Sequence, residues 1–241
     1  MIPLHDDNPT ELPPILTVTL IVVCVLVFLW QLGLGRAGQA AVYAFGVVPA
    51  VLFDKAALPP ELALIPPELT LITSMFLHGG WMHLLGNMLY LWIFGNNVED
   101  AMGHGRFLFF YLACGVMASL IHAMLAADST LPMIGASGAI SGVLGAYLLL
   151  YPHARVLVGI PLGFFLYTVS MPAGWVLALW FLMQFIGMSG AQPGAGGVAW
   201  MAHIGGFLVG MALVPFLKRE EVPLFHPAQK RVARRRDDPW P

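Results

Sequence analysis

The segment Gly135-Ala136-Ser137-Gly138-Ala139-Ile140-Ser141-Gly142 places a serine hydroxyl among small residues, and an apolar run of eight residues follows it directly. In a helix, residues four positions apart lie on one face, so Ser137, Ser141 and Gly145 form a row with almost no side-chain bulk. Gly138 begins a second row of this kind beside the first. Such rows let two helices approach closely inside a membrane. The segment therefore predicts a closely packed membrane helix with Ser137 at its start.

The apolar segment 198–217 offers a matching surface. Its small residues recur every four positions, at Ala202, Gly206 and Gly210. Packing of the two small faces would bring His203, which lies on the same side of the second helix, beside Ser137. Glycine and serine in membrane helices mostly serve packing, but an ionisable side chain inside an apolar helix is costly and more often has a function. Without a function, a neutral histidine here would bridge two helices by a hydrogen bond.

The composition indicates a membrane protein. Of the 241 residues, 59% are hydrophobic and only 10% are charged, and the mean hydropathy is +0.79, whereas soluble domains average about 25% charged residues. Nucleic acid is excluded as a partner because nearly all basic residues lie at one end of the chain. Cys24 and Cys114 show none of the spacings of a metal or redox site, so we expect core positions for both and neither a metal nor a cofactor.

Six apolar segments are expected to cross the bilayer, because about 20 apolar residues span its ~30 Å core. They are residues 15–34, 71–96, 107–127, 137–151, 174–188 and 198–217. The fourth is shorter than a full crossing, so the loop before it should dip into the membrane. No positively charged region precedes the first segment, so we expect a span there and not a signal peptide. The expected fold is an all-α membrane protein, a bundle of six transmembrane helices.

Three of the connecting segments have distinctive compositions. Residues 36–70 are broken by prolines yet rich in apolar residues, which favours a structured interfacial loop with short helices over a flexible linker. Residues 152–171 mix apolar and turn residues and suggest a segment along the membrane interface. Residues 189–197 are rich in glycine and contain a proline, as a flexible loop would.

The basic residues predict the orientation. An even number of crossings places both termini on one side, and the side richer in Lys and Arg is cytoplasmic. Of eleven Lys and Arg, seven lie in the tail 218–241, and Arg106 and Arg155 fall in loops on the same side; only Arg36 and Lys55 fall outside. We therefore expect a cytoplasmic segment 1–14, a membrane domain 15–217 and a basic cytoplasmic tail 218–241. In this orientation Ser137 and His203 both lie near the outer face.

Ser137 and His203 together suggest nucleophilic catalysis. Histidine, with a pKa near neutrality, can take the proton of a serine hydroxyl. The only acidic residue between Asp100 and Glu220 is Asp128, in a loop, so we expect a dyad without a carboxylate.

A tetrahedral intermediate also needs hydrogen-bond donors. His83 and Asn87 lie four residues apart on one helix face and could supply them, together with the Ser137 backbone N–H; alternatively, the pair is a polar bridge between helices. We expect His78 to be structural and His122 to bond a neighbour.

These residues resemble the rhomboid family of intramembrane serine proteases over nearly the whole length of the chain. The resemblance rests on the motif at 135–138, on Ala202-His203-Ile204-Gly205-Gly206, on His83 and Asn87, and on Glu99 followed by Gly103. It implies a six-helix fold, a first loop partly embedded in the membrane, a Ser137–His203 dyad, and His83 and Asn87 at the oxyanion. It also implies cleavage of single-pass transmembrane substrates without a cofactor.

We expect Gly135, Gly138 and Ser141 to line the substrate-binding pocket, and we expect the protein to lie in the lipid bilayer of a bacterial plasma membrane. The sequence departs from the family at two places. Leu69-Thr70 occupies the place of a Trp-Arg pair often found in the first loop, so an arginine that would anchor this loop to Glu99 is missing. Ser141 stands where some members have an aromatic residue stacked on the catalytic histidine.

Two other functions are compatible with a polar pocket in a membrane protein. One is a rhomboid-like protein that binds membrane clients without cutting them; the presence of both Ser137 and His203 argues against it. The other is a small transporter or channel, but we find neither the paired repeats nor the intramembrane charges that are usual in transporters. An aspartate pair within the spans and a His-Glu-x-x-His zinc motif are also absent from the sequence.

Overall fold

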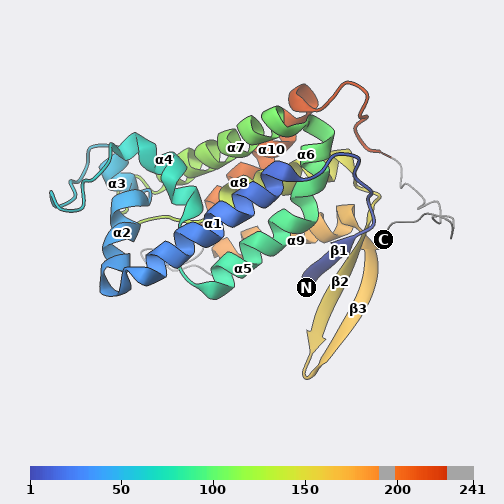
Figure 1. Ribbon diagram of the computed structural model, residues 1–241, viewed down its shortest axis with the longest axis horizontal. Helices are drawn as coiled ribbons and strands as arrows, with labels where there is room; N and C mark the ends of the chain where they lie inside the picture. The colour runs from blue at the N-terminus through green and yellow to red at the C-terminus, as the bar shows by residue number, and fades with distance from the viewer. Residues whose placement is uncertain (190–198, 227–241) are drawn as a thin grey trace.

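Long apolar runs of the sequence form the helices that make up most of the molecule, as the computed structural model of the chain shows (Figure 1). The structure describes residues 1–189 and 199–226. Three of the described helices are long and apolar enough to cross a membrane: α1 (Ile15–Gly33), α7 (His104–Leu125) and α10 (Trp200–Leu217). Two shorter apolar helices, α8 (Ser137–Leu150) and α9 (Ala173–Ser189), complete the bundle. The expected loop 189–197 lies, except for Ser189, outside the described residues, as does the tail from 227 onward.

The second expected span, 71–96, begins later and ends later than predicted. Two short helical segments, α4 (Thr70–Thr73) and η3 (Ser74–Phe76), are followed by a break. The helix itself starts at Trp81 and consists of α5 (Trp81–Tyr90), the π-helical turn η4 (Leu91–Gly95) and α6 (Asn96–Met102). Leu77 and Gly80 are extended where the helix breaks, and adjacent glycines at 79 and 80 disfavour helix.

The first loop forms short helices, as expected, at the end of the bundle opposite the N-terminus (Figure 1). They are η1 (Gly35–Ala37), α2 (Gly38–Phe45), α3 (Pro49–Leu52) and η2 (Pro67–Leu69). The loop also supports the segment before α8, because Val47 and Met133 exchange backbone hydrogen bonds of 3.0 and 2.8 Å. Gly135 N–H donates to the Ser74 carbonyl at 2.9 Å. The backbone leading to Ser137 is thus held by its neighbours.

Helix α8 lies at the centre of the bundle and packs tightly between α7 and α10. A Cβ atom added to Gly206 would collide with the Gly138 carbonyl, and one added to Gly210 would collide with the Gly142 carbonyl. On the other side, a Cβ added to Gly142 would lie 2.6 Å from Cβ of Cys114 in α7. The close approach of the two small faces, predicted from the sequence, is therefore confirmed.

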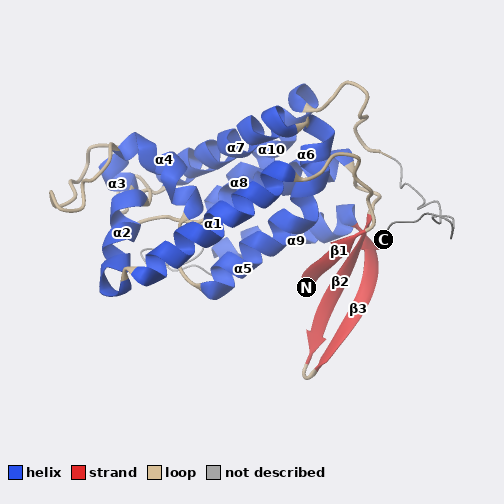
Figure 2. Ribbon diagram, viewed as in Figure 1, coloured by secondary structure: helices blue, strands red, loops and turns tan. Residues whose placement is uncertain are grey.

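A small sheet at one end of the bundle corrects the expectation of an all-α fold (Figure 2). Its three antiparallel strands are β1 (Ile2–Asp6), β2 (Arg155–Leu162) and β3 (Phe165–Pro172), in the order β1-β2-β3. Strands β2 and β3 are rich in β-branched and aromatic residues, which favour strands. Gly163, with a φ of 61°, opens the two-residue turn between them, where glycine is preferred. The segments expected to be polar or interfacial connections therefore include strands.

Hydrogen bonds join the sheet to the helices. The Asp6 side chain is 5% exposed and accepts hydrogen bonds from the Tyr147 hydroxyl at 2.7 Å and from Nδ2 of Asn97 at 2.9 Å. At the other side of the sheet, Ala173 N–H donates to the Ala154 carbonyl at 2.7 Å. The N-terminal strand and the start of α9 are thus fixed at the same end of the bundle.

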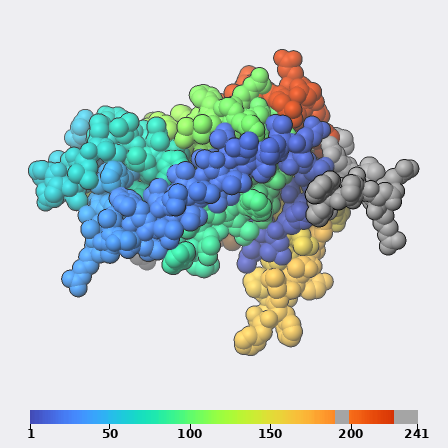
Figure 3. All heavy atoms as spheres, in the orientation of Figure 1, coloured from blue at the N-terminus to red at the C-terminus, as the bar shows by residue number. Residues whose placement is uncertain are grey.

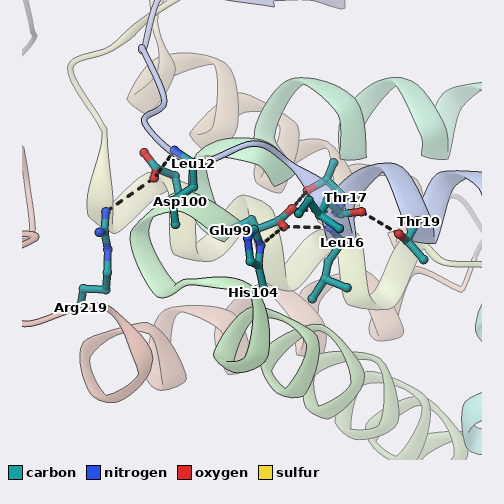
Figure 4. Close-up of polar contacts among 9 residues, drawn as sticks. Leu12, Leu16, Thr17, Thr19, Glu99, Asp100, His104 and Arg219 are labelled. Carbon is teal, nitrogen blue, oxygen red and sulfur yellow. Dashed lines mark hydrogen bonds and ion pairs between the residues drawn. The ribbon is translucent and has the colours of Figure 1, made fainter.

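Glu99 caps the N-terminus of α1 (Figure 4). Its carboxylate accepts the backbone N–H groups of Leu16 and Thr17, both at 2.8 Å, and the Thr17 hydroxyl at 2.7 Å. Free N–H groups at a helix start attract a carboxylate in this way. Nδ1 of His104 lies 2.6 Å from the same carboxylate. Glu99 therefore anchors the first helix, and the first loop lies at the opposite end of the bundle (Figure 1).

Candidate active site

Ser137 and His203 face each other where α8 and α10 begin. Oγ of Ser137 lies 2.8 Å from Nε2 of His203. Ser137 is the first residue of α8, and His203 lies in the first turn of α10. The contacts of Gly206 with Gly138 and of Gly210 with Gly142 bring the two backbones together directly after this pair. The sequence predicted this juxtaposition from the two small rows.

Helix α9 contributes two residues that the sequence analysis did not single out. Oε1 of Gln184 lies 2.8 Å from Nδ1 of His203, and Nε2 of Gln184 donates to the Trp180 carbonyl at 2.8 Å. The second bond requires the NH₂ group on that side, so the oxygen faces His203. An amide oxygen only accepts, so Nδ1 carries the proton and Nε2 of a neutral imidazole is left to accept from Ser137.

The Trp180 ring lies 6.0 Å from the His203 ring, between centroids, at an interplanar angle of 34°. An aromatic residue therefore contacts the histidine even though Ser141 occupies the place used by some family members. Trp180 and Gln184 are four residues apart in α9, and both face His203. A glutamine with a tryptophan one turn earlier, inside an otherwise apolar segment, was the available sequence signal.

His83 and Asn87 lie on α5 beside the segment that leads to Ser137. Gly79 N–H donates to Nδ1 of His83 at 3.4 Å, so Nε2 of a neutral His83 carries the proton. That nitrogen lies close to Gly135: a Cβ added there would be 2.7 Å from it. Gly135 also has a φ of 122°, a conformation that other residues rarely adopt. Nδ2 of Asn87 is buried without a hydrogen-bond partner among the described residues.

The three residues expected to line the substrate pocket occupy different positions. Gly135 and Gly138 lie on the wall of the cavity that contains Ser137. Ser141 is fully buried, and its hydroxyl donates to the Ser137 carbonyl at 2.6 Å. It is absent from the cavity wall because its side chain bonds back to its own helix. The structure therefore places Ser141 behind the nucleophile and not in the pocket.

A cavity of about 1310 Å³ joins these groups. Besides Ser137 and His203, its wall includes His83, Asn87, Trp180 and the loop between α7 and α8. His122 also lines the cavity, and its Nδ1 has no hydrogen-bond partner among the described residues, contrary to the expectation that it bonds a neighbour. His78, by contrast, exchanges hydrogen bonds of 3.0 and 3.4 Å with Gln31 through its backbone, as a structural residue would. In the described part of the chain, no three His, Cys, Asp or Glu side chains gather as metal ligands.

Comparisons with known proteins agree with this architecture. The chain is 34% identical over 145 residues to the yeast (Saccharomyces cerevisiae) Rhomboid protein 1, mitochondrial, covering 58% of this chain and 39% of the relative. It is 47% identical over 77 residues to Rhomboid protease GluP of Bacillus subtilis, covering 32% and 15%. It is 32% identical over 154 residues to Rhomboid-like protein 11, chloroplastic, of Arabidopsis thaliana, covering 61% and 52%. The chain thus spans between about a seventh and a half of the length of these relatives.

A family model described as Rhomboid domain matches residues 67–220, which include the segment before α8, the serine at its start and the whole of α10. The match covers more than half of the chain. This match and the apolar helices together identify a membrane protein, and the chain belongs to the rhomboid family.

Proposed function

We propose that this protein is an intramembrane serine endopeptidase that hydrolyses peptide bonds in or near transmembrane segments. The observation that supports it most is the 2.8 Å contact between Oγ of Ser137 and Nε2 of His203, at the wall of a cavity that His83 and Asn87 also line. The hydroxyl is within reach of a base whose other nitrogen is already bonded, which is the geometry that nucleophilic catalysis requires. Membership of a family that includes proteases points the same way.

In the proposed reaction, Nε2 of His203 takes the proton of the Ser137 hydroxyl while Oγ attacks the carbonyl carbon of the scissile bond. The tetrahedral intermediate collapses as the C–N bond breaks, and His203 gives the proton to the leaving amine. Water then attacks the acyl carbon while Nε2 of His203 takes its proton. The bond between the acyl carbon and Oγ breaks, His203 returns the proton to Oγ of Ser137, and the new carboxyl product leaves. Gln184 keeps the proton on Nδ1 throughout, in the position that a carboxylate has in a triad.

The oxyanion would be held by hydrogen-bond donors around the same cavity. Asn87 and His83 both line the cavity, and Nδ2 of Asn87 has no hydrogen-bond partner in the described part of the chain. The start of α8 has no side-chain cap, so the Ser137 N–H is a third candidate. Each such donor accelerates acyl transfer by about 10²–10³.

The proposed substrates are single-pass transmembrane proteins in the same bilayer, and no cofactor takes part. Gly135 and Gly138 would form the wall against which the scissile segment lies. We propose that the helical elements make six crossings, with α8 and α9 as short spans and the first loop partly embedded in the membrane. The segment would enter past α9, since this helix covers His203 through Trp180 and Gln184.

Both termini would be cytoplasmic, as the basic residues predict, with residues 1–14 and the tail from 218 onward on that side. The tail from 227 onward lies outside the described residues. Apolar helices and an orientation set by positive charge fit a bacterial plasma membrane.

Labelling with a fluorophosphonate probe tests the nucleophile. The wild-type protein should be labelled, and Ser137→Ala should not. Ser141→Ala is the matched control, because Ser141 is one helical turn away and should leave labelling intact. Labelling that persists in Ser137→Ala would mean another nucleophile. A folded wild-type protein that resists the probe and cuts no model span would favour the non-catalytic, client-binding alternative.

A further inference from the structure

The turn between β2 and β3 carries the most exposed apolar side chains of the sheet. Phe164 is fully exposed, and Phe165 is 81% exposed. Three neighbouring side chains are 56–63% exposed: Leu162, Leu166 and Tyr167. We call residues 162–167 the hairpin tip. In water, a contiguous apolar surface of this kind is unfavourable and usually marks a contact with a partner or a membrane.

Polarity changes sharply along the hairpin. Residues 156–172 contain no Asp, Glu, Lys, Arg or His. At the base, Arg155 is bonded across the strands, with Nε donating to the Ser170 hydroxyl and a terminal nitrogen donating to the Ser170 carbonyl, both at 3.0 Å. The hairpin therefore has a polar base and an uncharged, aromatic tip.

The direction of the hairpin sets what the tip can touch. It leaves the end of the bundle at which the N-terminus lies and projects to the side of the helices, instead of continuing along their axes (Figures 1 and 3). Its base is held by the ends of two apolar helices: Gly174 N–H donates to the Pro152 carbonyl at 2.9 Å, just after α8 and at the start of α9. Because lipid surrounds the spanning helices, a segment that projects sideways from their ends lies over or within the lipid surface.

The interface is the depth that suits this hairpin. Among the described residues, strand β3 pairs with β2 along one edge only. The backbone groups of its other edge need water or headgroups, which the hydrocarbon core does not provide. Aromatic side chains, on the other hand, are enriched at the boundary between headgroups and acyl chains. Trp175, 70% exposed in the first turn of α9, marks this level beside the hairpin base.

We propose that the hairpin tip anchors in the headgroup and acyl boundary of the bilayer, in the leaflet where α8 ends and α9 begins. Phe164 and Phe165 insert, and the strands lie along the surface with their free edge toward the headgroups. Because β3 runs directly into α9, this anchor fixes the base of the helix whose far half carries Gln184. The anchor depends on the membrane location of the chain and not on the proposed protease activity.

Site-directed fluorescence in reconstituted vesicles tests the anchor. Phe164→Cys is labelled with an environment-sensitive dye in phosphatidylcholine–phosphatidylglycerol vesicles; the native Cys24 and Cys114 are fully buried. Glu220→Cys is the matched control, an exposed polar position at the same end of the bundle. The dye at 164 should emit at shorter wavelength than the dye at 220. Lipids that carry a shallow nitroxide should quench it several-fold more than the control, and iodide should quench it less than the control.

A second variant checks that the aromatic side chains provide the anchor. With the dye on Leu166→Cys, the double substitution Phe164→Asp, Phe165→Asp should reduce quenching by nitroxide lipids several-fold. Unchanged quenching would overturn the proposal, as would a dye at 164 that behaves like the control at 220. A dye at 164 shielded from both quenchers, together with disulfide cross-linking between Phe164→Cys copies, would instead show that a second copy covers the tip.

Discussion

Oε1 of Gln184 in α9 accepts a hydrogen bond from Nδ1 of His203 in α10, at 2.8 Å. Gln184 is only 5% exposed, and its amide nitrogen is held by the Trp180 carbonyl. The imidazole is therefore oriented by a neutral amide on a neighbouring helix. If α9 moves to admit a substrate, this bond must loosen, so entry of the substrate and alignment of the base are coupled through one side chain.

We predict that Gln184→Leu lowers kcat at least tenfold with a small change in KM. The reason is that a lost hydrogen bond to a buried group costs about 1–3 kcal/mol and Nδ1 is left without an acceptor. Gln184→Glu keeps an acceptor and should retain activity with a shifted pH profile, because a carboxylate stabilises the protonated imidazole. The values of kcat and KM, and their pH profiles, are measured with a fluorescent model substrate in proteoliposomes.

Gln31→Leu is the matched control for Gln184. Gln31 is also a buried glutamine, but within the described residues its side chain bonds only the His78 backbone. Its loss should lower thermal stability and leave the pH profile of kcat unchanged. A Gln184→Leu protein with wild-type kcat and pH profile would refute the positioning role.

The sequence predicted the apolar helices and the meeting of Ser137 with His203 because both follow from local periodicity. A four-residue repeat of small residues specifies a helix face, and two such faces pack closely at Gly138 and Gly206. The start of α8 at Ser137 was also predicted correctly, because the apolar run follows the small residues of this motif directly.

The features that were missed depend on contacts distant in the chain. Strand β1 exists because residues 2–6 pair with β2, more than 140 residues away, and no local pattern encodes this pairing. Gln184 gains its importance only when α9 packs on α10. The hairpin turn at Gly163 was visible in the sequence, as two β-prone runs around a glycine, but hydrophobicity alone does not separate strands from an interfacial loop.

We predict that His203→Ala abolishes turnover, whereas Asn87→Ala slows it by on the order of 10²-fold. His203 is the proposed proton carrier, while Asn87 is one of several donors to the same oxyanion. Single-turnover rates with equal amounts of folded protein check both variants. His78→Ala, next to the cavity but not on its wall, is the control and should affect stability more than rate. Near-normal turnover in His203→Ala would contradict the mechanism.

We predict that Gly206→Ala destabilises the protein by about 1–3 kcal/mol, because its Cβ would overlap the Gly138 carbonyl and backbone cannot yield as a side chain can. The added methyl group would also push α8 and α10 apart and disturb the Ser137–His203 contact. The cleavage rate of the protein that remains folded should therefore fall as well. Thermal unfolding in detergent measures the first effect. Gly105→Ala is the control, because Gly105 is also helical and nothing lies within 4 Å of a Cβ added there. The thermal unfolding midpoint of this variant should not fall.

We predict cytoplasmic termini and an outer first loop. Arg106 donates to the Lys218 carbonyl at 3.4 Å, and Arg219 lies 3.5 Å from Asp100, so these basic residues share one end of the bundle (Figure 4 shows the Arg219 pair). Glu61→Cys should react with a membrane-impermeant maleimide in intact cells, and Glu220→Cys only after permeabilisation. Labelling of Glu220→Cys in intact cells, and of Glu61→Cys only after permeabilisation, would contradict the predicted orientation. It would also contradict the outer location of Ser137.

We predict that cleavage occurs near the outer boundary of a transmembrane segment, after a small residue and next to a helix-breaking Gly or Pro. A peptide bond inside an intact helix has its carbonyl hydrogen-bonded and is covered by side chains, so it must unwind before Ser137 can attack. Ser137 lies at the first-loop end of α8, beside the Gly135 and Gly138 wall. The His83 ring lies close to Gly135, and a Cβ added there would be 2.7 Å from its Nε2, so we expect the space beside Ser137 to favour a small residue before the scissile bond.

Model spans test this selection by unwinding. A parent span carries Ala at its outer end followed by a Gly-Pro pair, and its variant has leucine in place of that pair. The variant should be cut at least tenfold more slowly, because each Gly or Pro disfavours helix by about 1–3 kcal/mol relative to good helix formers. A third span, with Gly-Pro moved to the cytoplasmic half, controls for overall helicity and should resemble the leucine variant. Equal rates for parent and leucine variant, or a cut in the cytoplasmic half, would show that local unwinding at the outer boundary does not select the site.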